Sequence, residues 1–195
     1  MENTQAQFLR TLAGDVQHAF DRVDTSTTAS DRRNLLRTIV SAVEGVSWTY
    51  RAHIVFIVSE FDAVPVPDAL SEEQARYISS TDLIKLTTKL AKTICPDMAV
   101  DFGTIGWVHL NHTIRMRNRI THPKSLDDLT ISDQDIDQAK FGFFWFLDTA
   151  TRIMEDTLAE YSGLVSDLKA LGQQLTDGDP DALDLYHRTN RDRDL

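Results

Sequence analysis

Residues 32–62, RRNLLRTIVSAVEGVSWTYRAHIVFIVSEFD, carry apolar side chains at helical spacing over their whole length. The i, i+3, i+4 pattern from Leu35 through Phe61 predicts one long helix, although the run IVFIV alone would suit a strand. The segment VPVP at 64–67 ends this helix, because proline lacks a backbone N–H donor and restricts the residue before it. A helix of this length favours a helical fold for the chain.

Four further segments have the same periodicity. They are residues 5–23, about 70–95, about 104–121 and about 133–161. Ser71 with Gln74 has capping-box spacing, Pro123 forces His122 out of the helical conformation, and Ser132 precedes an acidic first turn. The sequence therefore predicts an all-α, up-and-down bundle of four to five helices.

Length and composition limit the domain organisation and the class of partner. The 195 residues suit one helical domain, residues 1–162, followed by an acidic tail, residues 163–195, that we expect to be weakly helical or disordered. A net charge of −10 argues against a non-specific nucleic-acid coat but allows a local basic cleft. Neither a signal peptide nor a membrane-spanning run is recognisable, so we expect a soluble, cytoplasmic protein without a membrane partner.

The stretch Trp107–Lys124, WVHLNHTIRMRNRITHPK, is the candidate functional segment. No Asp or Glu occurs between Asp101 and Asp127, in a chain with 30 acidic and 20 basic residues. The window contains four cations and three of the six histidines, namely Arg115, Arg117, Arg119, Lys124, His109, His112 and His122. This concentration of cationic donors and titratable imidazoles in an acidic protein favours a site that handles an anion.

The helix predicted for this window has two apolar faces with a polar strip between them. The first face consists of Trp107, Leu110 and Ile114, and the second of Val108, Met116 and Ile120. The strip between consists of Asn111, Arg115 and Asn118. Because a helix that is apolar on two sides is packed on two sides, we expect the strip to line a groove or an interface. Arg117 projects from a different side, and His122 lies beyond the helix end, from where it can fold back.

The motif Arg117-Asn118-x-x-x-His122-Pro123, at the end of the fourth predicted helix, resembles that of the HEPN superfamily. The signature of that family is Arg, four to six residues and then His, often with a polar residue directly after the Arg. The resemblance covers roughly residues 5–162. Arg115 to His122 also fits the signature, but Arg117 is preferred because Asn118 follows it, whereas Met116 follows Arg115.

The resemblance implies a HEPN-like fold and a metal-independent endoribonuclease of phage defence, toxin–antitoxin or stress-response systems. It implies RNA as the substrate, no cofactor, a homodimer whose two motifs face one cleft, and a possible antitoxin or regulatory protein. On this basis the catalytic residues would be Arg117, Asn118 and His122. The substrate-binding residues would be Asn111, Arg115, Arg119 and Lys124.

The chemistry of RNA cleavage fits these residue types. Cleavage without a metal needs a base for the 2′-OH proton, an acid for the leaving 5′-oxygen and a cation beside the phosphorane. His122 suits the proton transfer because its unperturbed pKa is near neutrality, and Arg117 offers a charged planar fork. Asn118 could orient the imidazole or the scissile group. One histidine per chain cannot easily be both acid and base, so a second copy across a dimer would supply the other group, and the product would carry a 2′,3′-cyclic phosphate.

Two residues of the 32–62 helix are predicted to support the site. Glu44 lies in an apolar helix with Arg51 near its face, and a carboxylate there needs a cation. Glu44 therefore pairs either with Arg51 of a neighbouring chain or with the Arg117 cluster.

Alternative interpretations remain for the histidines and for the whole window. His109 and His112 lie one turn apart and could share a metal, but neither an HExxH motif nor a partner carboxylate accompanies them. Arg and His near a helix C-terminus also complement its dipole and free carbonyls, which would make their role structural, in a structural dimer. The alternative function is a non-catalytic helical module that binds RNA or a protein, which the acidic pI of about 4.9 favours.

Overall fold

The computed structural model describes residues 4–25, 28–61 and 64–191, and the regular secondary structure of this part is entirely helical. Its α-helices are α1 (Thr4–Thr25), α2 (Ala29–Ser59), α3 (Ser80–Ala91), α4 (Ile105–Thr121), α5 (Asp133–Thr176) and α6 (Pro180–Arg191). Three short 3₁₀ helices lie in the connections, η1 (Asp68–Leu70), η2 (Gln74–Tyr77) and η3 (Asp127–Leu129). The all-α class is thus confirmed. Within these ranges, no helix is both long and apolar enough to span a bilayer.

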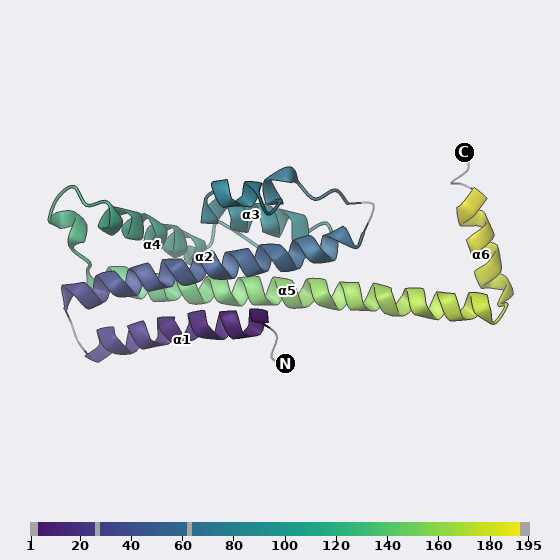
Figure 1. Ribbon diagram of the computed structural model, residues 1–195, viewed down its shortest axis with the longest axis horizontal. Helices are drawn as coiled ribbons and strands as arrows, with labels where there is room; N and C mark the ends of the chain where they lie inside the picture. The colour runs from purple at the N-terminus through teal and green to yellow at the C-terminus, as the bar shows by residue number, and fades with distance from the viewer. Residues whose placement is uncertain (1–3, 26–27, 62–63, 192–195) are drawn as a thin grey trace.

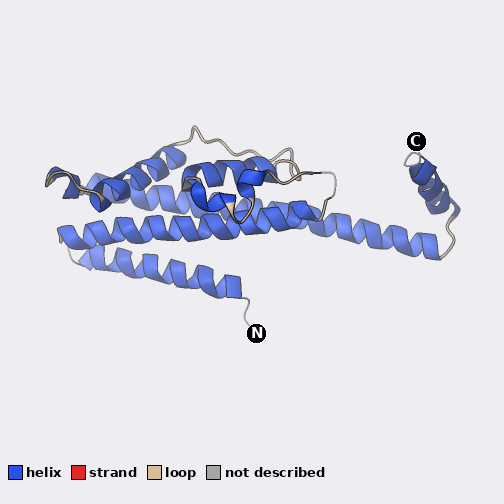
Figure 2. Ribbon diagram, turned by 45° about the horizontal axis from the view of Figure 1, so that its top comes forward, coloured by secondary structure: helices blue, strands red, loops and turns tan. Residues whose placement is uncertain are grey.

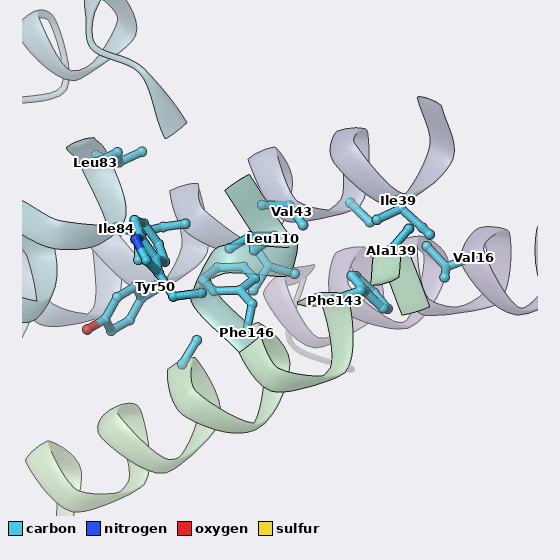
Figure 3. Packing of buried hydrophobic residues seen from close by; sticks show 14 of the residues in the cluster. Val16, Ile39, Val43, Tyr50, Leu83, Ile84, Leu110, Ala139, Phe143 and Phe146 are labelled. Carbon is cyan, nitrogen blue, oxygen red and sulfur yellow. The ribbon is translucent and has the colours of Figure 1, made fainter. Parts of the chain in front are cut away.

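Helix α2 is the central element of the bundle. It packs against α1, α3, α4 and α5, and Figure 1 shows α1 on one side of it and α3 and α4 on the other. Side chains of these helices pack in one core, to which α2 contributes Val43, α4 contributes Leu110 and α5 contributes Phe143 (Figure 3). The long helix predicted for 32–62 is therefore confirmed, although it begins at Ala29 and ends at Ser59, and Asp62 lies outside the described residues.

The segment 70–95 is not one helix, contrary to the prediction. The hydroxyl of Ser71 does accept a hydrogen bond from the Gln74 N–H at 3.2 Å, but the turn that follows is 3₁₀. The chain becomes extended at Ile78, and α3 begins only after Ser79, whose hydroxyl accepts from the Asp82 N–H at 3.1 Å. Serines that can cap a helix thus occur at positions 71 and 79, but a continuous apolar helix face follows only Ser79.

Helix α5 continues past residue 161, where the sequence pattern predicted its end, and stops at Thr176. It ends in a Schellman motif, in which Gly178 has φ 74° and the Asp179 N–H donates to the Gln174 carbonyl at 2.9 Å. Helix α6 starts directly afterwards at Pro180. The described part of segment 163–195 is therefore helical, and Figures 1 and 2 show it extending away from the bundle.

The backbones of α4 and α5 approach each other closely at Gly142. A Cβ atom added there would lie 2.5 Å from the Leu110 backbone nitrogen and 2.8 Å from the His109 carbonyl carbon. Because both atoms belong to the backbone of α4, they cannot yield without moving the helix that carries Arg117 and His122. The lack of a side chain at Gly142 therefore sets the position of α4.

We expect Gly142→Ala to lower the free energy of unfolding by about 1–3 kcal/mol, since the added methyl group overpacks the α4–α5 contact. Urea unfolding followed by circular dichroism measures this change. Gly172→Ala in the same helix is the matched control, because no atom lies within 4 Å of a Cβ added there. The control should be neutral or stabilising by up to about 1 kcal/mol. Equal effects of both substitutions would contradict the close approach.

Candidate functional site

The C-terminal end of α4 presents His122 to solvent. Its backbone N–H donates to the Asn118 carbonyl at 3.1 Å, and its φ of −124° and ψ of 59° lie outside the helical region. Pro123 accounts for this stop, as the sequence predicted. The His122 side chain is exposed, and within the described residues its imidazole makes no hydrogen bond or ion pair. The ring is thus available to a substrate.

Arg117 forms an ion pair with Glu44 of α2. The side chains are 26% and 46% exposed, so the pair lies at the rim of the bundle rather than in its core. The sequence analysis left two partners open for Glu44, namely Arg51 of a neighbouring chain and the Arg117 cluster. Within this chain, Glu44 pairs with Arg117. The carboxylate restricts the guanidinium of Arg117 and neutralises part of its charge.

Arg51 does not join Arg117. Its side chain is buried, and its Nε donates to the Leu70 carbonyl at 2.7 Å. The guanidinium also lies over the Trp48 ring, 5.2 Å from the centroid. Arg51 therefore holds η1 against α2, whereas Glu44 contacts Arg117.

The polar strip of α4 is more open than expected. Asn111 is half-buried and its Nδ2 donates to the Trp107 carbonyl at 2.9 Å, whereas Arg115 and Asn118 are exposed. In the part of the chain that the structure describes, Arg115 donates only to the Asn111 carbonyl, at 3.3 Å. The second apolar face is not fully packed either, because Val108 is 47% exposed. Within one chain, the strip is accessible surface and not the lining of a groove.

Arg119 and Lys124 take different positions in the connection to α5. Arg119 donates to the Thr130 carbonyl at 3.0 Å, which ties α4 to the loop. The Lys124 side chain is exposed, while its backbone N–H donates to Asp128 Oδ2 at 2.7 Å. That hydrogen bond, with a second from Ser125 N–H, holds the pKa of Asp128 below its usual value. Arg119 thus supports the loop, and the Lys124 side chain, which has no partner among the described residues, can reach an anion.

Two arginines of α2 hold the same loop and a third holds the end of α4, and the sequence analysis did not single them out. Arg32 and Arg33 donate to the carbonyls of Ile131 and Leu129, both at 3.2 Å. Arg37 donates to the Ile120 carbonyl at 3.3 Å, two residues before His122. Arg37 therefore adds a cation to the end of α4, from a position more than eighty residues earlier in the chain.

The two remaining histidines of the window have separate environments. His112 Nε2 lies 2.9 Å from Asp135 Oδ1, a partner that the sequence analysis did not foresee. His109 packs its ring against Phe141 at a centroid distance of 5.5 Å. In the described residues, no three His, Cys, Asp or Glu side chains are grouped in a way that could hold a metal ion.

Asp135 joins α4 to the first turn of α5. Its Oδ2 accepts from the Ser132 N–H at 2.9 Å in a capping box, while Oδ1 faces His112. Burial raises the pKa of this carboxyl group, but the hydrogen bonds from Ser132 and His112 outweigh burial and leave the pKa below its usual value of 3.8. The ionised form is therefore the one that stabilises the fold.

We expect Asp135→Asn to cost about 1–3 kcal/mol of unfolding free energy at pH 7, because a charged acceptor of several hydrogen bonds is lost. A carboxyl group with a lowered folded-state pKa stabilises the protein above its unfolded pKa of about 3.9 and loses this contribution as pH falls through the folded-state pKa. The difference in unfolding free energy between wild type and Asp135→Asn, measured by urea unfolding, should thus narrow below pH 4. A gap that persisted unchanged at pH 2.5 would contradict this role.

No protein-family model, curated protein or solved structure shows significant similarity to this chain. The functional argument therefore depends on the residues at the end of α4 and on their geometry.

Proposed function

We propose that this protein is a metal-independent endoribonuclease of the HEPN type, with Arg117, Asn118 and His122 as its catalytic residues. The observation that carries the proposal is that a restrained cation and an exposed imidazole both occur at the C-terminal end of α4. Arg117 is held by Glu44, and five residues later His122 lies at the helix end, where its imidazole has no partner among the described residues. The all-helical bundle of α1–α5 is compatible with a HEPN-like fold.

The roles follow from the chemistry of the groups. Attack of the 2′-oxygen on the adjacent phosphorus requires that the 2′-OH lose its proton and that the 5′-oxygen gain one as it leaves. His122 transfers one of these protons, since imidazole exchanges protons near pH 7. Arg117 stabilises the negative charge that develops on the phosphorane, and Asn118, exposed next to it, contacts the scissile group.

A homodimer would supply the second proton-transfer group. Among the described residues of each chain, His122 is the imidazole without a partner at this site. Two copies that bring their α4 ends together would therefore place two His122 side chains at one phosphate. Lys124, Arg115 and Asn111 would then contact the flanking phosphates. An antitoxin or other regulatory protein that covers the α4 end would control the activity, as in defence, toxin–antitoxin or stress-response systems.

A non-catalytic RNA- or protein-binding module is the second candidate. The observation in its favour is that Glu44 already neutralises part of the Arg117 charge, in a chain with ten more acidic than basic residues. Such a module would bind RNA or a partner protein at the α4 end without changing it.

Incubation of purified protein with total RNA and a tRNA pool, in EDTA and in Mg²⁺, tests the proposal. We expect discrete cleavage products at equal rates in both conditions. Loss of cleavage in EDTA would contradict a mechanism based on His122 and Arg117 alone. Binding without cleavage in either condition would favour the second candidate.

A further inference from the structure

A groove of about 410 Å³ lies between α1 and α2. Figure 1 shows these two helices running side by side, joined at the end of the bundle where α4 also terminates. The volume falls within the range of sites for small organic ligands, about 300–1,000 Å³. The side chains that line the groove include an apolar floor of Leu12, Ala19, Leu35 and Ala42.

Arg37 connects this groove with the end of α4. It lines the groove, and its guanidinium donates to the Ile120 carbonyl and to Asn34 Oδ1, both at 3.3 Å. Both acceptors are neutral, and within the described part of the chain Arg37 forms no ion pair. Its positive charge is therefore not offset by a carboxylate, in contrast to that of Arg117.

The rim of the groove offers hydrogen-bonding groups of several kinds, together with the ion pair between Arg22 and Asp31, whose atoms lie 3.1 Å apart. Thr38 and Ser41 contribute hydroxyls from α2, while His18 and Asp15 contribute an imidazole and a carboxylate from α1. The Asp15, His18 and Ser41 side chains are exposed. Hydroxyls, an imidazole and a carboxylate above an apolar floor match a ribose and a base, which present donors and acceptors around a flat apolar face.

We propose that the α1–α2 groove binds the nucleotide adjacent to the cleaved phosphate of single-stranded RNA, and that Arg37 binds the phosphate between the groove and His122. This inference rests on the proposed RNA cleavage at His122. The base would lie against the apolar floor, with its polar edge toward Asp15 and its ribose toward Thr38 and Ser41. The substrate would thus be an unpaired segment, because a base within a duplex cannot enter the groove.

A fluorescent single-stranded RNA with 2′-O-methyl groups tests the groove by itself, since its blocked 2′-oxygen cannot attack the phosphate. Fluorescence anisotropy gives its Kd for wild type, Arg37→Ala and Ser41→Phe. The phenyl ring of Ser41→Phe would fill the groove from an exposed position without entering the core. The matched controls are Arg152→Ala, which removes another arginine bound to a carbonyl, and Ser166→Phe, which introduces the same ring at an exposed position of α5.

We expect each groove variant to raise Kd about tenfold or more, the effect of losing one charge-assisted contact or the space for a base, and each control to stay within about twofold. An unchanged Kd for Ser41→Phe would overturn the proposal that the groove binds a nucleotide, even if wild type cleaves ordinary RNA. Conversely, weakened binding in both groove variants of a protein that cleaves nothing would support the groove and refute the proposed catalysis. Circular dichroism verifies that each variant is folded.

Discussion

Replacement of His122 by alanine is expected to lower the rate of RNA cleavage by at least about a hundredfold and up to about ten-thousandfold, the contribution of a positioned general acid or base. The imidazole is exposed and unpaired within the described residues, so its removal leaves no buried group without a partner. The free energy of unfolding should therefore change by less than about 0.5 kcal/mol. Cleavage of a labelled RNA and urea unfolding measure the two effects.

His18→Ala is the matched control for His122→Ala, since His18 is also an exposed histidine but lies on α1. It lines the proposed nucleotide groove, so its effect should fall on KM rather than on kcat. If His122→Ala retained the wild-type kcat, the imidazole would have no part in the chemistry. The arginine and histidine at the end of α4 would then serve the helix terminus.

Arg117→Ala is expected to reduce kcat by about a hundredfold to a thousandfold, because a fixed donor to the transition-state charge is lost. Arg117→Lys should recover only part of the activity, since an ammonium group keeps the charge but not the planar fork that binds two phosphate oxygens. Single-turnover cleavage at saturating RNA separates this effect from binding. Because Arg117 is half-buried and bound to Glu44, unfolding must be measured alongside.

Glu44→Gln distinguishes a positioning role from simple charge neutralisation. Loss of the carboxylate frees Arg117, so RNA should bind more tightly while kcat falls, because the guanidinium is no longer held in one orientation. Tighter binding with no change in kcat would contradict the positioning role of Glu44. Weaker binding would show that the carboxylate does not compete with the phosphate for Arg117.

Much of the fold could be predicted where local signals decide the structure. The proline after His122 ends α4, and Ser132 with Asp135 starts α5, as expected from the sequence. The start of α3 was misplaced because Ser71 and Ser79 both offer a helix cap, and burial of the residues that follow decides between them. The end of α5 was misplaced because Gly163 lies in open space, where a glycine weakens a helix without breaking it.

The sequence indicated which residues share α4, but it indicated contacts between helices only in part. Arg117 and His122 lie close together in sequence. For Glu44, which needs a counter-ion, the sequence analysis left two partners open, and the Arg117 cluster was one of them. No sequence pattern indicated a role for Arg37, because arginine is common on exposed helix faces. Only the fold shows that its side chain reaches the Ile120 carbonyl. His112 was likewise assigned no carboxylate, since its partner Asp135 lies on the next long helix.

The most direct test of the account is the chemical nature of the product ends. Wild-type protein and His122→Ala would be incubated in EDTA with an unpaired RNA, and the termini of the fragments would be mapped. The account predicts 2′,3′-cyclic phosphate and 5′-hydroxyl ends with wild type and no fragments with His122→Ala. Fragments with 3′-hydroxyl and 5′-phosphate ends, or equal cleavage by both proteins, would contradict the proposal that His122 moves a proton in attack by the 2′-oxygen.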